Sequence, residues 1–266
     1  MRRAAAMACG VVLGVAASAI HAATGQKGAI PGAVRLDAVK QIRKSVDGWP
    51  LIEAPTSPAT QRINATLTQL NLQLKDSIRT CDANYRAWAD DARQVLRGKN
   101  SVSNDWIRTV SVTMTGPEFL SMVATDDYIF CGGAHPDNNT SAMVFDLRTG
   151  DAVDWIKLIA PSAGASVVSG SGAKGAVVLA ALRTMSVDAA EADCRGAFED
   201  KQAYVLWPDT RQESLMAMPV NLPHDVQACA TQLTVTLPQA KQMGFSEALL
   251  DAIERANGPQ HGAKEP

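Results

Sequence analysis

The chain has 266 residues, of which 46% are hydrophobic and 20% charged, and its formal net charge is −2 at pH 7. A net charge so close to zero provides no basic surface for nucleic acid, so we expect no nucleic-acid partner. The hydrophobic content is sufficient for a globular core, and the length allows one large domain or two small ones.

Residues 1–22 have the three-part pattern of a secretory signal peptide. Arg2 and Arg3 precede an apolar run, and small residues then lead to Ala22, after which we expect cleavage. The apolar run is short and rich in alanine and glycine, and no later stretch approaches the roughly 18 uncharged apolar residues that a membrane span needs. We therefore expect a soluble periplasmic or secreted protein without a membrane span.

Four cysteines remain after the signal peptide, an even number that indicates two disulfides in an exported protein. They are Cys81, Cys131, Cys194 and Cys229. Among the possible pairings we favour Cys81 with Cys131 and Cys194 with Cys229, because each bridge then closes a loop within one half of the chain. In the chain-entropy model, a bridge that closes a loop of this size stabilises the protein by about 4 kcal/mol. No CxxC spacing occurs, so we expect neither a zinc site nor a thiol redox centre.

The first half of the mature chain is dominated by one helical pattern. Residues 23–48 are expected to form a flexible lead-in, and the prolines of 49–58 favour an extended segment. Apolar residues then recur at three- and four-residue steps, which predicts one long helix, or two in line, over 60–97 with Cys81 on the buried stripe. Ser57 or Thr60 can cap the start of this helix.

After residue 100 the hydrophobic period changes to two, which is typical of strands. In the first strand we expect Trp106, Val110, Val112 and Met114 to share one face. Further strands are predicted over 118–124, 127–131 and 141–147. Short neighbouring strands of this kind favour antiparallel hairpins.

The second half alternates between flexible, helical and strand-like patterns. A flexible connection is predicted over 161–175, a helix from 176 to about 185, and a tail over 258–266. The remaining predictions are strands over 203–207, 214–220 and 232–237, and a helix over 246–255. The fold class is therefore α+β, an antiparallel sheet packed by a long N-terminal helix and shorter C-terminal helices, with two disulfides. We expect two subdomains, 49–150 and 151–257.

Catalytic patterns are weak. Three glycines at 170–175 spell GxGxxG, but no buried strand precedes them, so we interpret the segment as a linker. His135 and His224 are each followed by an aspartate, Asp137 and Asp225, and a hydrolase that uses both histidines is the alternative hypothesis. Neither spacing matches a known metal motif, so we expect no metal and no cofactor.

The stretch CGGAHPDNNT predicts a sharp turn after a strand. Its glycines can adopt positive φ values and its proline fixes the exit of the chain, so we assign a structural turn to Gly132, Gly133, His135 and Pro136. A polar loop follows and is a possible binding loop, formed by Asp137, Asn138, Asn139 and Thr140.

Several of these motifs resemble the extracytoplasmic domain of the RsiV anti-sigma factor family, a domain of unknown function that also accompanies some peptidoglycan deacetylases. The resemblance rests on Tyr128 with GGAHP, on FDLRTG at 145–150 and on WIKLI at 155–159. The segment LPHDVQACATQLTVTLP at 222–238 is a plausible downstream counterpart. The family also carries an asparagine-containing helix, which corresponds here to Ile63-Asn64.

Members that resemble the anti-sigma factor act through this domain as receptors that bind lysozyme. The resemblance therefore implies a non-catalytic periplasmic binding module for a cell-envelope ligand, such as a lysozyme-like muramidase or peptidoglycan. This chain differs from the receptor because it has a cleavable-looking signal in place of the receptor's membrane span, so we do not expect direct control of a sigma factor.

Overall fold

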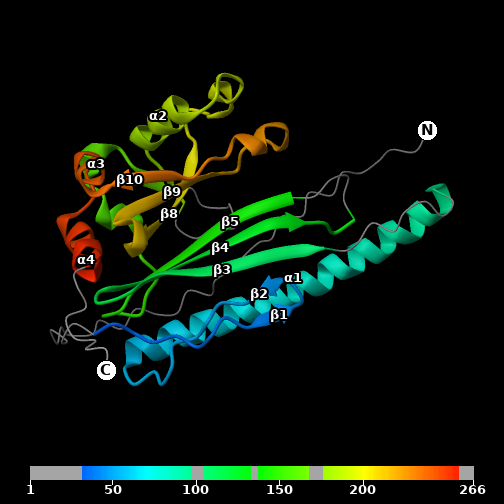
Figure 1. The fold of residues 1–266 in the computed structure, drawn as a ribbon, viewed down its shortest axis with the longest axis horizontal. Coiled ribbons are helices and arrows are strands. Elements are labelled where there is room, and N and C mark those ends of the chain that lie inside the picture. Colours follow the sequence, from blue (N-terminus) through cyan, green and yellow to red (C-terminus); the bar gives the residue numbers. More distant parts are fainter. Residues whose placement is uncertain (1–31, 97–104, 133–136, 168–175, 258–266) are drawn as a thin grey trace, which may run out of the picture.

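The computed structural model describes residues 32–96, 105–132, 137–167 and 176–257. The predicted signal peptide, the tail over 258–266 and the GxGxxG glycines lie outside these residues. Two five-stranded sheets pack face to face, and the long helix α1 lies along the outer face of the first sheet (Figure 1). The predicted α+β class, long helix, shorter helices and disulfides are confirmed, although the strands form two sheets instead of one.

The first sheet has the order β1-β2-β3-β4-β5 and is antiparallel except for the parallel pair β2 and β3. Its strands are β1 (Gln41–Arg43), β2 (Val46–Asp47), β3 (Trp106–Thr115), β4 (Phe119–Ile129) and β5 (Asp137–Asp146). The second sheet has the order β10-β9-β8-β7-β6 and is antiparallel throughout. Its strands are β6 (Ser166–Val167), β7 (Val177–Val178), β8 (Ala203–Asp209), β9 (Ser214–Val220) and β10 (Leu233–Thr236).

The helices surround these sheets. The α-helices are α1 (Pro58–Leu96), α2 (Ala180–Ala189), α3 (Leu237–Gln242) and α4 (Glu247–Asn257). The 3-10 helices are η1 (Trp155–Leu158), η2 (Pro161–Ala163), η3 (Ala192–Ala197), η4 (Thr210–Gln212) and η5 (His224–Cys229). Residues of α2, α3 and α4 join the hydrophobic cluster that includes residues of both sheets, so these helices close the second half of the molecule.

Helix α1 packs on the first sheet through the stripe that its sequence predicts. Ile63, Leu67, Leu74, Ile78 and Cys81 are all buried, and each buried aliphatic side chain contributes about 1.5–3 kcal/mol. The predicted N-terminal cap is confirmed. The backbone N–H of Thr60 donates to Ser57 Oγ at 3.1 Å, and the backbone N–H of Ser57 donates to Thr60 Oγ1 at 3.1 Å.

Two asparagines of α1 hold the extended segment that precedes the helix. Asn64 accepts from the backbone N–H of Ile52 at 2.8 Å and donates to the carbonyl of Ile52 at 2.9 Å. Asn71 makes the same pair of bonds with the backbone of Trp49, at 2.8 and 2.9 Å. Residues seven apart lie on the same side of a helix, so both amides act on one segment. This segment therefore lies fixed along α1.

Strand β4 corrects one prediction. The sequence suggests separate strands over 118–124 and 127–131 because the pair Asp126-Asp127 reads as a solvated break, whereas the structure has one strand through both. Asp126 is buried and accepts hydrogen bonds at 2.6 Å from Arg108 Nη1 and at 2.6 Å from Trp106 Nε1. The Arg108 guanidinium also lies 5.2 Å from the ring centroid of Trp49. A charged pair thus replaces the expected break.

Strand β3 corrects a second prediction. Val110 and Val112 face α1, but Met114 lies in the core between the sheets. A bulge between Val112 and Met114 inserts one extra residue, Thr113, and this reverses the alternation of faces. Thr113 and Ser121 share a buried hydrogen bond of 2.7 Å at the same place, which satisfies their hydroxyl groups between the sheets.

Strand β5 corrects a third prediction. The polar residues Asp137, Asn138, Asn139 and Thr140 were assigned to a loop, but they are the first four residues of β5. Asp and Asn are depleted in strands, which is why the sequence suggests a loop. Pairing with β4 overrides this preference, with Thr140 opposite Thr125 and Asn139 opposite Asp126. Because β5 is an edge strand of the sheet as ordered, its polar start remains partly exposed to solvent.

Removal of the Arg108 side chain should destabilise the protein strongly. Arg108→Ala leaves Asp126 buried without its cation, so the free energy of unfolding should fall by about 3–5 kcal/mol in urea titrations. Arg79→Ala is the matched control, because its partner Asp76 lies on the exposed side of α1, and it should cost less than about 1 kcal/mol. Equal losses in the two variants would contradict this account of β4.

Removal of one asparagine clamp should also be measurable. Asn64→Ala leaves the backbone N–H and C=O of the buried residue Ile52 without partners, so unfolding free energy should fall by about 1–3 kcal/mol. Asn84→Ala, at an exposed position of the same helix, changes helix propensity equally and serves as the control. A loss in Asn64→Ala no larger than in the control would refute the clamp.

Candidate functional site

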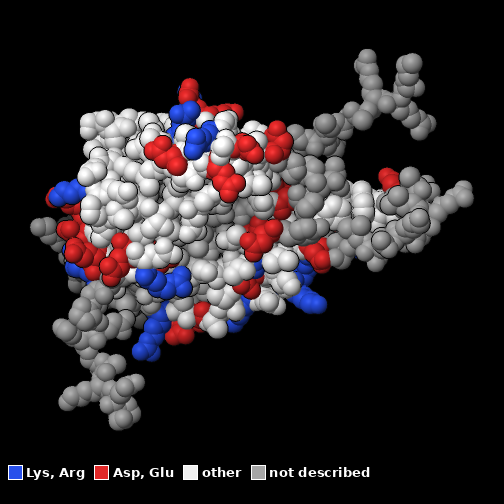
Figure 2. All heavy atoms as spheres, turned by 45° about the horizontal axis from the view of Figure 1, so that its top comes forward, with Lys and Arg blue, Asp and Glu red and all other residues white. Residues whose placement is uncertain are grey.

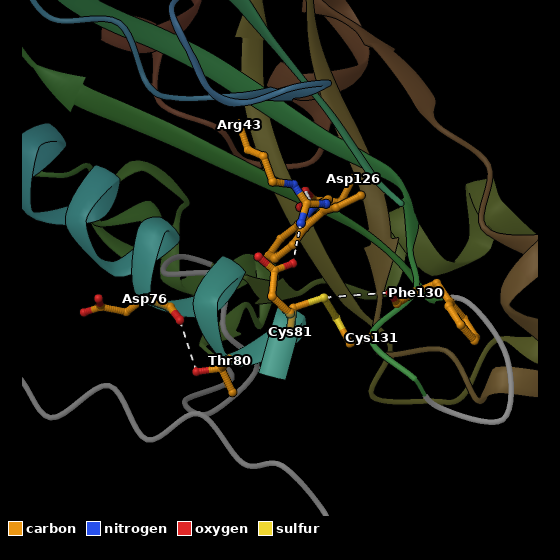
Figure 3. Close-up of a disulfide and its surroundings, with 9 residues drawn as sticks. Arg43, Asp76, Thr80, Cys81, Asp126, Phe130 and Cys131 are labelled. Carbon is orange, nitrogen blue, oxygen red and sulfur yellow. Dashed lines mark hydrogen bonds and ion pairs between the residues drawn. A yellow bond between two sulfur atoms is a disulfide. The ribbon is translucent and has the colours of Figure 1, made fainter. Parts of the chain in front are cut away.

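The end of β4 is fixed to α1 by the first disulfide. Cys81 and Cys131 are bonded, as predicted, with their Cα atoms 4.6 Å apart (Figure 3). The ring centroid of Phe130 lies 5.2 Å from that of Trp88 and 6.2 Å from that of Tyr85, both on α1. The strand that enters the CGGAHP stretch is therefore held to the helix by a covalent bond and an aromatic cluster.

Gly132 explains why a glycine follows the cysteine. Its φ is +80°, and a Cβ atom at this position would lie 2.6 Å from Trp88 Cβ and 3.0 Å from the carbonyl oxygen of Asn84. Both the conformation and the close approach to α1 exclude larger side chains. Gly133, His135 and Pro136 lie outside the described residues, so their structural-turn role stays a prediction.

Gly132→Ala should destabilise the protein because it combines a positive φ with a backbone clash against α1. We expect a loss of at least about 1–3 kcal/mol in the free energy of unfolding. Gly196→Ala is a matched control, because a Cβ at Gly196 meets no atom within 4 Å, and it should be close to neutral. Similar unfolding midpoints for both variants would contradict the close packing of Gly132.

A small pocket lies where the start of β5 meets the end of β9 and the helix η5. Its volume is about 50 Å³. Gln227 of η5 bridges the two sides, because its Nε2 donates to Asp137 Oδ1 at 3.0 Å and to the carbonyl of Asn138 at 3.1 Å. The lining residues are Asn138, Asn139, Thr140, Met218, Pro219, Val220, Asn221, Leu222, Gln227 and Ala230. The pocket is thus mainly amide-lined on one side and apolar on the other.

The pocket lies at the border of the area that the second sheet covers. Thr109, Thr125 and Thr140 form a cross-strand row on the face of the first sheet that is turned away from α1. Thr109 is exposed, Thr125 is half-buried and Thr140 is buried. Burial therefore increases along the row toward the pocket, and the adjoining part of this sheet face remains open to solvent.

The surroundings of the pocket are acidic. The lining segments 137–147 and 214–236 and the neighbouring strand segment 119–132 contain no lysine or arginine, whereas η3, which is bonded to η5, carries the exposed Arg195. Asp127, Asp137 and Asp225 within them are exposed. Acidic side chains also exceed basic ones across the middle of the face seen in Figure 2. Carboxylates and amide oxygens together form a surface that favours cationic hydrogen-bond donors.

The second disulfide supports the same region. Cys194 of η3 is bonded to Cys229 of η5, as predicted, with their Cα atoms 5.4 Å apart. Cys229 lies two residues after Gln227, so the bridge holds the wall that carries Gln227. His224 is the first residue of η5, and its side chain lies outside the described part of the structure. His135 is not among the described residues. The proposed histidine pair therefore stays a prediction.

Within the described parts of the chain, no cluster of three or more His, Cys, Asp or Glu side chains has an arrangement that could hold a metal ion. In the same parts, no helix is both long and apolar enough to cross a membrane.

Comparisons with known proteins name no activity. No protein-family profile matches the chain, and no curated protein matches it at a significant level. A solved structure of a DUF3298 family member from Bacteroides fragilis is similar, with 8% identity and a TM-score of 0.49, covering 85% of this chain and 100% of that one. A DUF3298 family protein from Pseudomonas aeruginosa has 15% identity and a TM-score of 0.35, covering 60% and 70%. DUF3298 denotes a domain of unknown function, and the link to the RsiV family stays a prediction.

The sequence reasoning missed the residues on the far side of the pocket. Gln227, Asn221 and Met218 are distant from the predicted binding residues in the chain, and only the packing of the two sheets brings them together. The sequence does contain one indication of Gln227. This residue lies between His224 and Cys229, within the segment 222–238 that contributes to the family resemblance.

Proposed function

We propose that the chain is an exported, non-catalytic binding module that recognises a cell-envelope ligand through the pocket at the start of β5. The observation that carries this proposal is the bridge from Gln227 to Asp137 and Asn138, which joins the predicted binding residues to η5 in one polar surface. Two disulfides suit a protein of an oxidising compartment, and the predicted signal peptide leads to the same compartment.

Charge favours one of the two ligand classes that the resemblance implies. Asp127, Asp137 and Asp225 are exposed around a pocket whose lining segments contain no lysine or arginine. A basic protein such as a lysozyme-like muramidase would find complementary charge here, and its lysine or arginine side chains could donate to the carboxylates and amides. The pocket is small, so it suits the end of one such side chain better than a sugar ring. We therefore place the muramidase ahead of peptidoglycan.

The binding proposal predicts a charge-dependent loss of affinity. Asp137→Asn/Asp225→Asn should weaken binding to a basic C-type lysozyme at least tenfold at low salt, with a smaller difference at high salt because ions screen exposed charges. Glu53→Gln/Glu254→Gln removes two exposed carboxylates elsewhere on the surface and should retain the affinity of the unaltered protein. Titration calorimetry measures both variants.

The result that would contradict the proposal is equal affinity in both double variants. Retention on peptidoglycan sacculi without binding to lysozyme would instead favour the glycan ligand. Circular dichroism of each variant checks that its fold is unchanged, so that a difference in affinity reflects the binding surface.

The hydrolase remains the second candidate because the same bridge brings two chain segments together. Asp137 follows His135 by two residues, and Gln227 follows His224 by three. If both histidines act in catalysis, His135→Ala/His224→Ala abolishes the release of soluble fragments from peptidoglycan. A binding module releases no fragments in either form.

A further inference from the structure

We propose that the Cys194–Cys229 bridge is a redox-sensitive clamp on the η5 wall of the pocket, whereas the Cys81–Cys131 bridge is a permanent staple. The two disulfides differ in what surrounds them and in what else holds the segments that they join. The surroundings of a bridge determine whether a reductant can reach its sulfur atoms. The other contacts of the joined segments determine which segment is released when that bridge is broken.

Accessibility separates the two bridges. Cys81 is 3% exposed and lies in a hydrophobic cluster with Val46, Ile78 and Trp106, and its half-buried partner Cys131 packs against the same cluster. Cys194 and Cys229 are both half-buried, and exposed residues flank them in the chain at 191–193, 195–196 and 228. Thiol–disulfide exchange requires a thiolate to reach a sulfur atom, and the second bridge is the one in which neither cysteine is buried.

The second bridge is also the main anchor of η5. None of its side chains that the structure describes is buried. Among the described residues, its other hydrogen bonds are the two from Gln227 to β5 and short-range backbone bonds such as Val226 N–H to the carbonyl of Pro223. In contrast, α1 around Cys81 is anchored by its whole buried stripe. Loss of the Cys194–Cys229 bond would therefore release η5 while the sheets stay folded.

The step is an ordinary exchange with a dithiol. A thiolate of the dithiol attacks one sulfur of the bridge and forms a mixed disulfide, and the other cysteine leaves as a thiolate that takes up a proton. The second sulfur of the dithiol then displaces the first cysteine, which is also protonated. The bridge gains two electrons and two protons, and the dithiol is oxidised to its own disulfide.

The position of Cys229 in the chain determines how loss of the bridge would affect the pocket. Cys229 lies between Gln227 and Ala230, which both line the pocket, so release of η5 removes one wall. Oxidation restores that wall and, with it, the bridge from Gln227 to Asp137. The effect on ligand binding rests on the proposed function, whereas the release of η5 does not.

The test treats the full protein with increasing dithiothreitol under native conditions, followed by alkylation and peptide mass spectrometry. Cys194 and Cys229 should be alkylated at least tenfold faster than Cys81 and Cys131. At that stage, amide hydrogen exchange over 222–230 should accelerate at least tenfold, whereas exchange over 63–81 of α1 stays unchanged. Equal alkylation of both bridges, or unchanged exchange over 222–230, would overturn the clamp.

A variant provides an independent check without a reductant. Cys194→Ser/Cys229→Ser should show the fast exchange over 222–230 of the reduced protein, and slow exchange in this variant would overturn the proposal. The lysozyme titration then separates the two hypotheses. If η5 is released and affinity falls, both are supported, and if η5 is released with affinity unchanged, the clamp is supported while the pocket fails as the binding site.

Discussion

The first sheet is buried on both faces along much of its length, and most features of the protein follow from this constraint. Helix α1 covers one face, and the second sheet covers the other. Polar groups inside such a sheet must find partners within the protein, since water cannot reach them. Arg108 Nη1 and Trp106 Nε1 both donate to Asp126 on the α1 side, where Arg108 Nε stays buried without a hydrogen-bond partner, and Thr113 bonds Ser121 on the opposite side.

The second sheet covers only part of that opposite face, and the candidate site lies where its coverage ends. There the start of β5, the end of β9 and η5 meet around one small pocket. Because β5 is at the edge of the first sheet, its polar first residues are available for contacts with a ligand. Pairing with the neighbouring strand β4 holds these residues in place. A rigid platform with an exposed polar border is the arrangement that binding sites favour.

The sequence was most informative where one period or one residue type dominates. The stripe of α1, its Ser57 cap, the strands β8, β9 and β10 and the pairing of both disulfides could all be predicted, whereas β6 and β7 lie where the sequence predicts a flexible connection and a helix. Local patterns failed where a distant partner decides the outcome. Asp126 reads as a break until Arg108 lies opposite it, and Asn139 reads as a loop until β4 pairs with β5.

The same limit applies to the candidate site. The predicted binding residues 137–140 do line or adjoin the pocket, but Gln227, Asn221 and Met218 join them only through the packing of one sheet on the other. No spacing in the chain encodes such a contact. The acidic character of the region, in contrast, is visible in the sequence as long segments without lysine or arginine.

We propose that this acidic, amide-lined pocket is the surface that binds a basic envelope protein. The most direct measurement is the amide hydrogen-exchange footprint of the oxidised protein in the presence and absence of saturating C-type lysozyme. Binding at the pocket should protect 137–140 and 218–230. Protection confined to the exposed side of α1, with these two segments unchanged, would contradict it.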